Sequence, residues 1–133
     1  MNKNVNLIIG SGVIGAYLTK LLLSKKDKVI VTSRKNKKSF KNYEYLKIQN
    51  KVKFVKLDVT KTRAIEKVLD KYKPNKIFYF AGQSSIPKSI LLPQETYNSH
   101  YLGTKNFLEV LKKKEKLSFL KQILVIFLNL KKA

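Results

Sequence analysis

Short apolar runs alternate with longer segments of helical period along most of the chain. Four of the runs are only a few residues long and apolar at nearly every position, which predicts buried strands. These strands are expected at 5–9, 28–32, 52–57 and 77–80. Helices are expected at 13–23, 63–72 and 94–114. The alternation is typical of a doubly wound α/β fold, in which helices cover both faces of a parallel sheet of about four to five strands.

Apolar positions within the expected helices indicate which faces are buried. In the first helix one face carries four such residues: Ile14, Leu18, Leu21 and Leu22. In the long last helix the apolar positions include Leu102, Leu108 and Leu111.

A glycine-rich turn, Gly10-Ser11-Gly12-Val13-Ile14-Gly15, separates the first strand from the first helix. Gly10 permits a tight turn, Gly12 lets the backbone approach a pyrophosphate, and Gly15 lets the helix lie close to the strand. The helix N-terminus offers free N–H groups and partial positive charge to phosphates. Residues 10–15 are therefore predicted to bind a dinucleotide on a Rossmann fold. The alternative is a turn glycine, a helix cap and a third glycine by chance.

The end of the second strand bears on the choice of nicotinamide cofactor. NAD-type sites place an Asp or Glu there for the ribose hydroxyls, whereas this chain has VTSRK at 31–35, without an acid. Arg34 suits a 2′-phosphate, because it offers a permanent charge and several donors. We expect NADP, with NAD as the alternative. Arg34 would otherwise be one more solvated base in a lysine-rich loop.

Three further segments carry a family resemblance: FVKLDVT at 54–60, KPNKIFYFAGQS at 73–84 and HYLGTKNFLE at 100–109. With the glycine turn they make residues 5–116 similar to the extended short-chain dehydrogenase/reductase family. Within it, the chain resembles the GDP-mannose 4,6-dehydratases and the related sugar-nucleotide epimerases and dehydratases. The parent activity implied is dehydration of a nucleotide-activated hexose such as GDP-mannose, by hydride transfer to and from NADP. A sugar-nucleotide 4-epimerase is the alternative within the family.

The resemblance also implies cofactor contacts. Asp58 and Val59 match the family's acidic-hydrophobic pair, which contacts the adenine. The small Ala81 and Gly82 would let the cofactor pass close to the fourth strand, and Gln83 is typical of the dehydratases. Two features depart from the family's pattern. The first two glycines are one residue closer together, and His100 stands where Asn is common; we interpret His100 as a structural substitute rather than a catalyst.

No catalytic residue is assigned. The resemblance places the active-site Tyr, with a Lys four residues later, beyond the fifth strand, and no Tyr follows Tyr101. Tyr101 and Lys105 satisfy this spacing, but they lie inside the last expected helix, so we interpret the match as chance. We therefore expect residues 1–133 to be one truncated dinucleotide-binding domain, the N-terminal part of such an enzyme, inactive by itself.

The segment 117–133 fits poorly where the family's fifth strand should end in small and hydroxyl residues. Back-translated with A/T-leaning codons and read in a shifted frame, it gives F-F-K-A-N-S-G-Y-I-F-E-L-K-K, which is similar to that strand and the stretch after it. Lys112, Lys113 and Lys114 would be encoded by a run of A, where a polymerase can slip. We interpret 117–133 as a frameshifted tail; the alternative is a genuine short apolar C-terminus.

The composition limits the partners. The net charge is +21, from 29 basic and 8 acidic residues, but only Arg34 and Arg63 are arginines and the lysines occur in every segment. We attribute this excess to a genome rich in A and T and expect no nucleic-acid partner. The rival interpretation is a non-enzymatic nucleotide-binding or basic interaction module.

Other features of the sequence bear on metal, disulfide and membrane sites. Cysteine is absent, which excludes disulfides and thiolate metal sites, and no metal site is expected. No apolar run reaches the roughly 18 residues of a membrane span, and the N-terminus lacks a secretory signal. We expect a cytoplasmic protein without a membrane partner.

Overall fold

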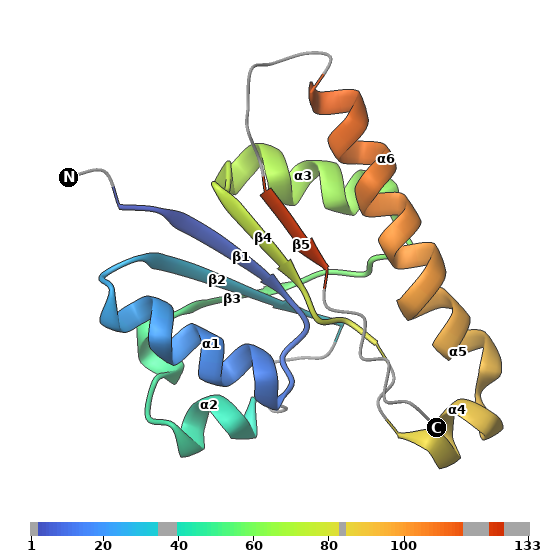
Figure 1. Cartoon of the computed structure of the whole chain (residues 1–133), viewed down its shortest axis with the longest axis horizontal. Coiled ribbons are helices and arrows are strands. Elements are labelled where there is room, and N and C mark those ends of the chain that lie inside the picture. Colours follow the sequence, from blue (N-terminus) through green and yellow to red (C-terminus); the bar gives the residue numbers. More distant parts are fainter. Residues whose placement is uncertain (1–2, 35–39, 83–84, 116–122, 127–133) are drawn as a thin grey trace.

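Five parallel strands form one sheet in the order β3-β2-β1-β4-β5 (Figure 1). The computed structural model describes residues 3–34, 40–82, 85–115 and 123–126. The strands are β1 (Val5–Ile9), β2 (Lys28–Ser33), β3 (Lys53–Lys56), β4 (Lys76–Tyr79) and β5 (Ile123–Ile126). In the central strand β1, Leu7 is aligned with Ile30 of β2 and Ile77 of β4. The predicted doubly wound parallel sheet is confirmed.

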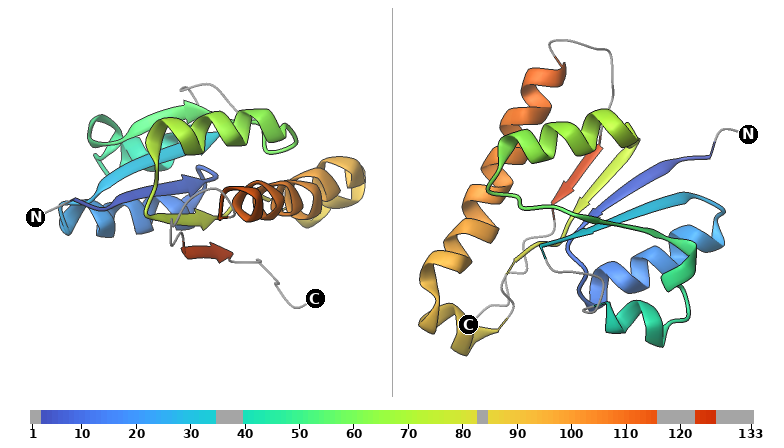
Figure 2. Two further views of the ribbon diagram at one scale, coloured as in Figure 1. Left: turned by 90° about the horizontal axis from the view of Figure 1, so that it is seen from above. Right: turned by 180° about the vertical axis from the view of Figure 1, so that it is seen from behind.

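Helices cover the sheet on both faces. They are α1 (Val13–Ser24), α2 (Lys41–Tyr45), α3 (Thr62–Tyr72), α4 (Ile86–Leu91), α5 (Pro93–Tyr97) and α6 (Gly103–Glu115), with a 3-10 turn at Gln49–Lys51 and a π-helical turn at Asn98–Leu102. Figure 2 shows α3 and α6 beside one another, with α1 across the sheet from them.

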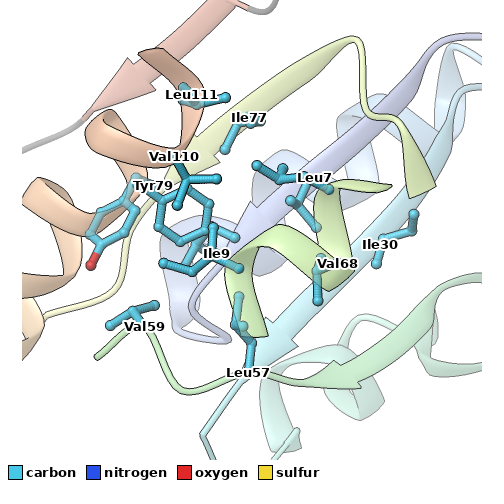
Figure 3. Packing of buried hydrophobic residues seen from close by; sticks show 13 residues of the cluster. Leu7, Ile9, Ile30, Leu57, Val59, Val68, Ile77, Tyr79, Val110 and Leu111 are labelled. Carbon is cyan, nitrogen blue, oxygen red and sulfur yellow. The ribbon is translucent and has the colours of Figure 1, made fainter. Parts of the chain in front are cut away.

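Alternate residues of β1, β2, β3 and β4 enter two separate hydrophobic clusters. Leu7 and Ile9 of β1 pack with residues of α3 and α6, such as Val68 and Val110 (Figure 3). Ile8, between them, belongs to a second cluster with residues of α1 and α2. Both faces of β1 are therefore buried, which explains why four of its five residues are apolar.

The buried face of α1 differs from the expected one. Ile14 and Leu21 are 52% and 53% exposed, and the buried residues of the helix are Gly15, Ala16, Thr19 and Leu22. Small residues face the sheet because the helix lies very close to it. A Cβ on Gly15 would stand 3.2 Å from Ile8 Cγ2, and the Thr19 hydroxyl donates to the Gly15 carbonyl at 2.7 Å. The expectation was right for Leu22 and wrong for Ile14 and Leu21.

The expected long helix at 94–114 consists of α5, the π-helical turn and α6. Leu111 is buried, as its spacing indicates, whereas Leu108 is 47% exposed. The short helices α2 and α4 were not expected from the sequence. In α2, Tyr43 is fully buried and packs edge-on against Phe40 and Phe54.

Most of the segment 117–133 lies outside the described residues. Its described part, β5, pairs in parallel with β4, with Val125 aligned with Phe78. This pairing concerns the chain as it stands, so the frameshifted tail stays a prediction. Among the described residues, no helix is both long and apolar enough to cross a membrane. In the same part of the chain, no group of three or more His, Cys, Asp or Glu residues is placed to hold a metal ion.

Candidate dinucleotide-binding site

The glycine turn lies where the strand order reverses, at the carboxyl end of β1 between β2 and β4. In open α/β sheets ligands bind in the crevice at this point. The Gly10 N–H donates to the Thr32 carbonyl at 3.0 Å, and the Phe80 N–H donates to the Ile9 carbonyl at 2.7 Å. Gly10 has φ +105°, and a Cβ there would lie 3.0 Å from Ala81 N. Only glycine fits this tight turn, which is the role expected of Gly10.

The next two glycines have opposite surroundings. Gly12 is exposed, and a Cβ there would meet no atom within 4 Å. Gly15 is buried, and a Cβ there would lie 3.1 Å from the Gly10 carbonyl oxygen. Gly12 is also the N-cap of α1 and has no side chain to cap it. The turn therefore leaves open space in front of helix N–H groups that have no intrahelical acceptor.

The other predicted residues of the turn lie around this opening. Ser11 is partly exposed, and the side chains of Val13 and Ile14 are more than half exposed. Because both apolar side chains belong to the first turn of α1, they flank the exposed helix start rather than the core.

Charged side chains gather beyond the ends of β2 and β3. Arg34 Nη2 lies 4.0 Å from Glu95 Oε2 of α5, and both side chains are about half exposed, at 51% and 49%. Asp58 Oδ1 accepts hydrogen bonds from the Thr60 N–H at 2.9 Å and the Thr60 hydroxyl at 2.7 Å. Partial burial raises the pKa of Asp58, but Thr60, Lys61 and Arg34 together hold it below its usual value.

Sequence reasoning missed Glu95, because its proximity to Arg34 depends on where α5 lies relative to the end of β2. No local motif around either residue indicates the pairing. The Arg34 neighbourhood therefore does contain a carboxylate, although the end of β2 does not.

The side chain of Val59 is buried in the core, whereas that of its neighbour Asp58 is partly exposed. Its side chain is 4% exposed and belongs to the cluster of Figure 3. A Cβ on Gly103 would lie 2.5 Å from Val59 Cγ2 and would overlap the Tyr79 hydroxyl. The Asn106 side-chain N–H₂ donates to the Val59 carbonyl at 2.9 Å. The Val59 side chain therefore holds α6 against the sheet, and of the predicted adenine pair Asp58 alone keeps its side chain outside the core.

Ala81 and Gly82 follow β4, next to the π-helical turn. Ala81 is partly buried and Gly82 is exposed. A Cβ on Gly82 would overlap the His100 ring, 2.8 Å from Nδ1. The His100 imidazole thus packs on the glycine, and its interpretation as a structural residue stays a prediction. Gln83 lies outside the described residues.

The sequence profile of the GDP-mannose 4,6 dehydratase family matches residues 7–124. The chain belongs to this family. The resemblance derived from the sequence motifs is thereby confirmed, and the family match includes the glycine turn and the residues around Asp58, Ala81 and Gly103.

The individual proteins that resemble this chain are distant relatives. Haemophilus influenzae dTDP-glucose 4,6-dehydratase is 24% identical over 82% of the chain, and Schizosaccharomyces pombe UDP-glucose 4-epimerase uge1 is 30% identical over 78%. The UDP-glucose 4-epimerase of Thermus thermophilus, in complex with NAD, matches 84% of the chain with a TM-score of 0.71 and 22% identity. The chain spans 33%, 30% and 34% of these three proteins, in that order.

Tyr101 and Lys105, which have the spacing of the family's Tyr–Lys pair, each have another neighbour in the described part of the chain. Tyr101 is 55% exposed and its ring lies 5.1 Å from that of Tyr97. Lys105 Nζ is 3.8 Å from Glu109 Oε1 on the same helix. Tyr79 is buried, which raises its pKa to about 12, and its hydroxyl donates to the Ser99 carbonyl at 2.8 Å. Tyr79 therefore has a packing role, and a proton donor at neutral pH needs a lower pKa.

Proposed function

We propose that this chain is the NADP-binding region of a sugar-nucleotide dehydratase similar to GDP-mannose 4,6-dehydratase. The observation that carries the proposal is the glycine turn at the reversal of strand order. Gly10 turns tightly against the start of the β4 loop, and Gly12 leaves open space in front of the N-terminus of α1. A pyrophosphate fits such a place because it accepts hydrogen bonds from free N–H groups and is stabilised by the helix dipole.

The rest of the cofactor would extend to both sides of this turn. Residues 10–15 would hold the pyrophosphate, and Asp58 with the backbone of Val59 would meet the adenosine. Ala81, Gly82 and Gln83 would border the cofactor along β4. The NAD-bound epimerase of similar fold supports a nicotinamide dinucleotide as the ligand.

Arg34 would select the phosphorylated form of the cofactor. It is half exposed beyond β2, on the side of the sheet edge where Asp58 lies, close enough to lower the pKa of that carboxyl. A guanidinium donates charge-assisted hydrogen bonds to phosphate, which are stronger than bonds to a ribose hydroxyl.

The bound nicotinamide would supply hydride transfer at the hexose of a nucleotide sugar. The 133-residue chain would bind the cofactor without turnover, because Tyr101, in the π-helical turn, and Lys105, on α6, precede the fifth strand and Lys105 lies near Glu109. GDP-mannose incubated with the chain and NADP should give no 4-keto-6-deoxy product. The 30% identity to a UDP-glucose 4-epimerase supports a second candidate, the cofactor region of a 4-epimerase.

Cofactor titration tests the proposal directly. The dissociation constants of NADPH and NADH are measured for the unaltered chain, for Arg34→Ala and for Arg63→Ala. The unaltered chain should bind NADPH more tightly, and Arg34→Ala should lose on the order of 1–3 kcal/mol of NADPH affinity and little for NADH. Arg63→Ala removes the other arginine, on α3, and should change neither constant. Equal affinities that Arg34→Ala leaves unchanged would refute the NADP preference.

A further inference from the structure

A carboxylate lies near Arg34 although it is far from Arg34 in the sequence: it belongs to Glu95. NAD-type sites have an Asp or Glu at the end of β2, whose oxygens accept hydrogen bonds from the ribose hydroxyls. Here that place is taken by Arg34, and α5 brings Glu95 to 4.0 Å from the guanidinium. Both side chains are about half exposed, so a ligand arriving at Arg34 meets Glu95 as well.

The charges around Arg34 are of both signs. Asp58 is held by the Thr60 N–H and hydroxyl, and it lies close enough to Arg34 for the guanidinium to lower its pKa. Lys61 acts on Asp58 in the same direction. Glu95 adds a second negative charge next to Arg34. A phosphate placed on this guanidinium would therefore be attracted by one group and repelled by a carboxylate a few ångströms away.

We propose that Glu95 is a specificity-determining residue, which limits the preference for a cofactor with a 2′-phosphate over one with a free 2′-hydroxyl. The inference rests on the proposed function, because it needs the adenosine ribose to lie beside Arg34. A carboxylate repels a phosphate, whereas it accepts a hydrogen bond from a hydroxyl. Arg34 and Glu95 thus act in opposite directions on the same choice. The preference of the chain for NADP over NAD is then smaller than it would be with Arg34 alone.

The repulsion should be modest and sensitive to salt. Both groups are half exposed, so water screens the interaction, and added salt reduces it further. Removing the charge of Glu95 should therefore tighten NADPH binding about three- to tenfold at low ionic strength. NADH binding should stay the same or weaken, since its 2′-hydroxyl loses an acceptor with the full charge.

The variant Glu95→Gln tests this inference, because it removes the charge and keeps the size of the side chain. Dissociation constants for NADPH and NADH are measured for the unaltered chain and for the variant at low and high salt. Glu109→Gln is the matched control: it removes the same charge from an exposed helical position whose neighbour is Lys105. The expected result is a higher NADH-to-NADPH ratio of dissociation constants for Glu95→Gln alone, by about three- to tenfold, with a smaller effect at high salt.

The outcomes separate this inference from the proposed function. If the unaltered chain binds neither cofactor, both are overturned. If it binds them and the ratio is the same in Glu95→Gln, or NADPH binds more weakly, the role of Glu95 is overturned and the proposed function stands. A role of Glu95 confined to the stability of α5 would lower the unfolding temperature without moving the ratio, which also overturns the inference.

Discussion

A glycine stands at the N-terminus of each of two helices, α1 and α6, at the same edge of the sheet, and the two glycines have contrasting surroundings. Gly12 precedes α1, is exposed, and has no atom within 4 Å of the place where a Cβ would be. Gly103 begins α6, is buried, and has the Tyr79 hydroxyl and Val59 Cγ2 in that place. The space beside Gly12 is open, whereas the space beside Gly103 is filled by the side chains of Tyr79 and Val59.

The contrast shows that a glycine in a family motif can serve binding or packing. In the proposed complex, a methyl group added at Gly12 would meet the cofactor, whereas one added at Gly103 would push α6 away from β4 and from Val59. The two substitutions should therefore separate cofactor binding from stability.

Gly103→Ala should have the largest effect. The added methyl group would overlap the Tyr79 hydroxyl and lie 2.5 Å from Val59 Cγ2, in a helix that Asn106 ties to the Val59 carbonyl. Overpacking of this kind should lower the free energy of unfolding by about 3 kcal/mol, as measured in urea. The matched control is Gly12→Ala, which should cost less than about 1 kcal/mol, the difference between glycine and alanine as an N-cap. Equal losses in the two variants would contradict the comparison.

Alkaline pH should weaken the α6 contact through Tyr79. Burial raises the pKa of Tyr79 to about 12, above the ordinary value of 10.0. The folded state therefore favours the neutral phenol, so this stability is fully present below pH 10 and is lost as pH rises toward about 12. The loss should reach roughly 2 kcal/mol. Tyr43, with a pKa also raised to about 12, should add a similar loss.

The variant Tyr79→Phe isolates the contribution of Tyr79 to the loss of stability at alkaline pH. Every other ionisable group is common to both proteins, so the difference between their unfolding free energies from about pH 8 to about pH 11.5 reports Tyr79 alone. At about pH 8 the free energy of unfolding of the variant should be lower by about 1 kcal/mol, since the variant loses the hydrogen bond to the Ser99 carbonyl. As the pH rises, this free energy should then decrease less steeply than that of the unaltered chain. Parallel curves would show that Tyr79 titrates normally.

The sequence was sufficient to predict β1 to β4, but not β5, and to predict the conformational roles of the turn glycines. Val5–Ile9 is apolar at four of its five positions and is followed at once by glycine, so its extent was predicted to the residue. The positive φ of Gly10 follows from the same local pattern. Such features depend on neighbouring residues, which is why a local pattern predicts them.

The remaining features depend on how separate elements pack. The buried face of α1 was predicted from large apolar residues, but a helix lying this close to a strand buries small ones, Gly15 and Thr19. The motif match included Gly103 without showing that Tyr79 and Val59 fill the space in front of it. The approach of Glu95 to Arg34 likewise depends on the placement of α5. None of these contacts leaves a periodic signal in the sequence.

Gly12→Ala should act on the cofactor while the fold is kept. If the pyrophosphate lies against the Gly12 backbone, the new methyl group would push it away from the N–H groups of α1. We expect at least about tenfold weaker binding of both NADPH and NADH, about 1.4 kcal/mol, because the pyrophosphate is common to both. The variant should unfold nearly as the unaltered chain does. Unchanged affinity for both cofactors would place the pyrophosphate elsewhere.

The smallest change in stability is expected from altering the surroundings of Asp58, whose neighbour Val59 packs against Gly103. Partial burial raises the pKa of Asp58, and the Thr60 hydroxyl, the Thr60 N–H, Lys61 and Arg34 outweigh this and lower it. A lowered pKa means that Asp58 contributes stability above its unfolded-state pKa, and this stability is lost as pH falls through the folded-state pKa. Thr60→Val removes the hydroxyl donor and leaves the backbone N–H in place, so the pKa of Asp58 should rise toward its usual value.

Carboxyl titration by NMR and acid unfolding together measure this effect. In Thr60→Val the Asp58 carboxyl should titrate at higher pH, and the free energy of unfolding should decrease less between about pH 5 and about pH 2. The change should be small because Asp58 is partly exposed and water screens its charge interactions. Arg34→Ala should raise the same pKa by less, since Arg34 contributes least among these groups. If Arg34→Ala had the larger effect, the guanidinium would act on Asp58 more strongly than the Thr60 hydroxyl does, and Asp58 would then oppose a 2′-phosphate at this edge together with Glu95.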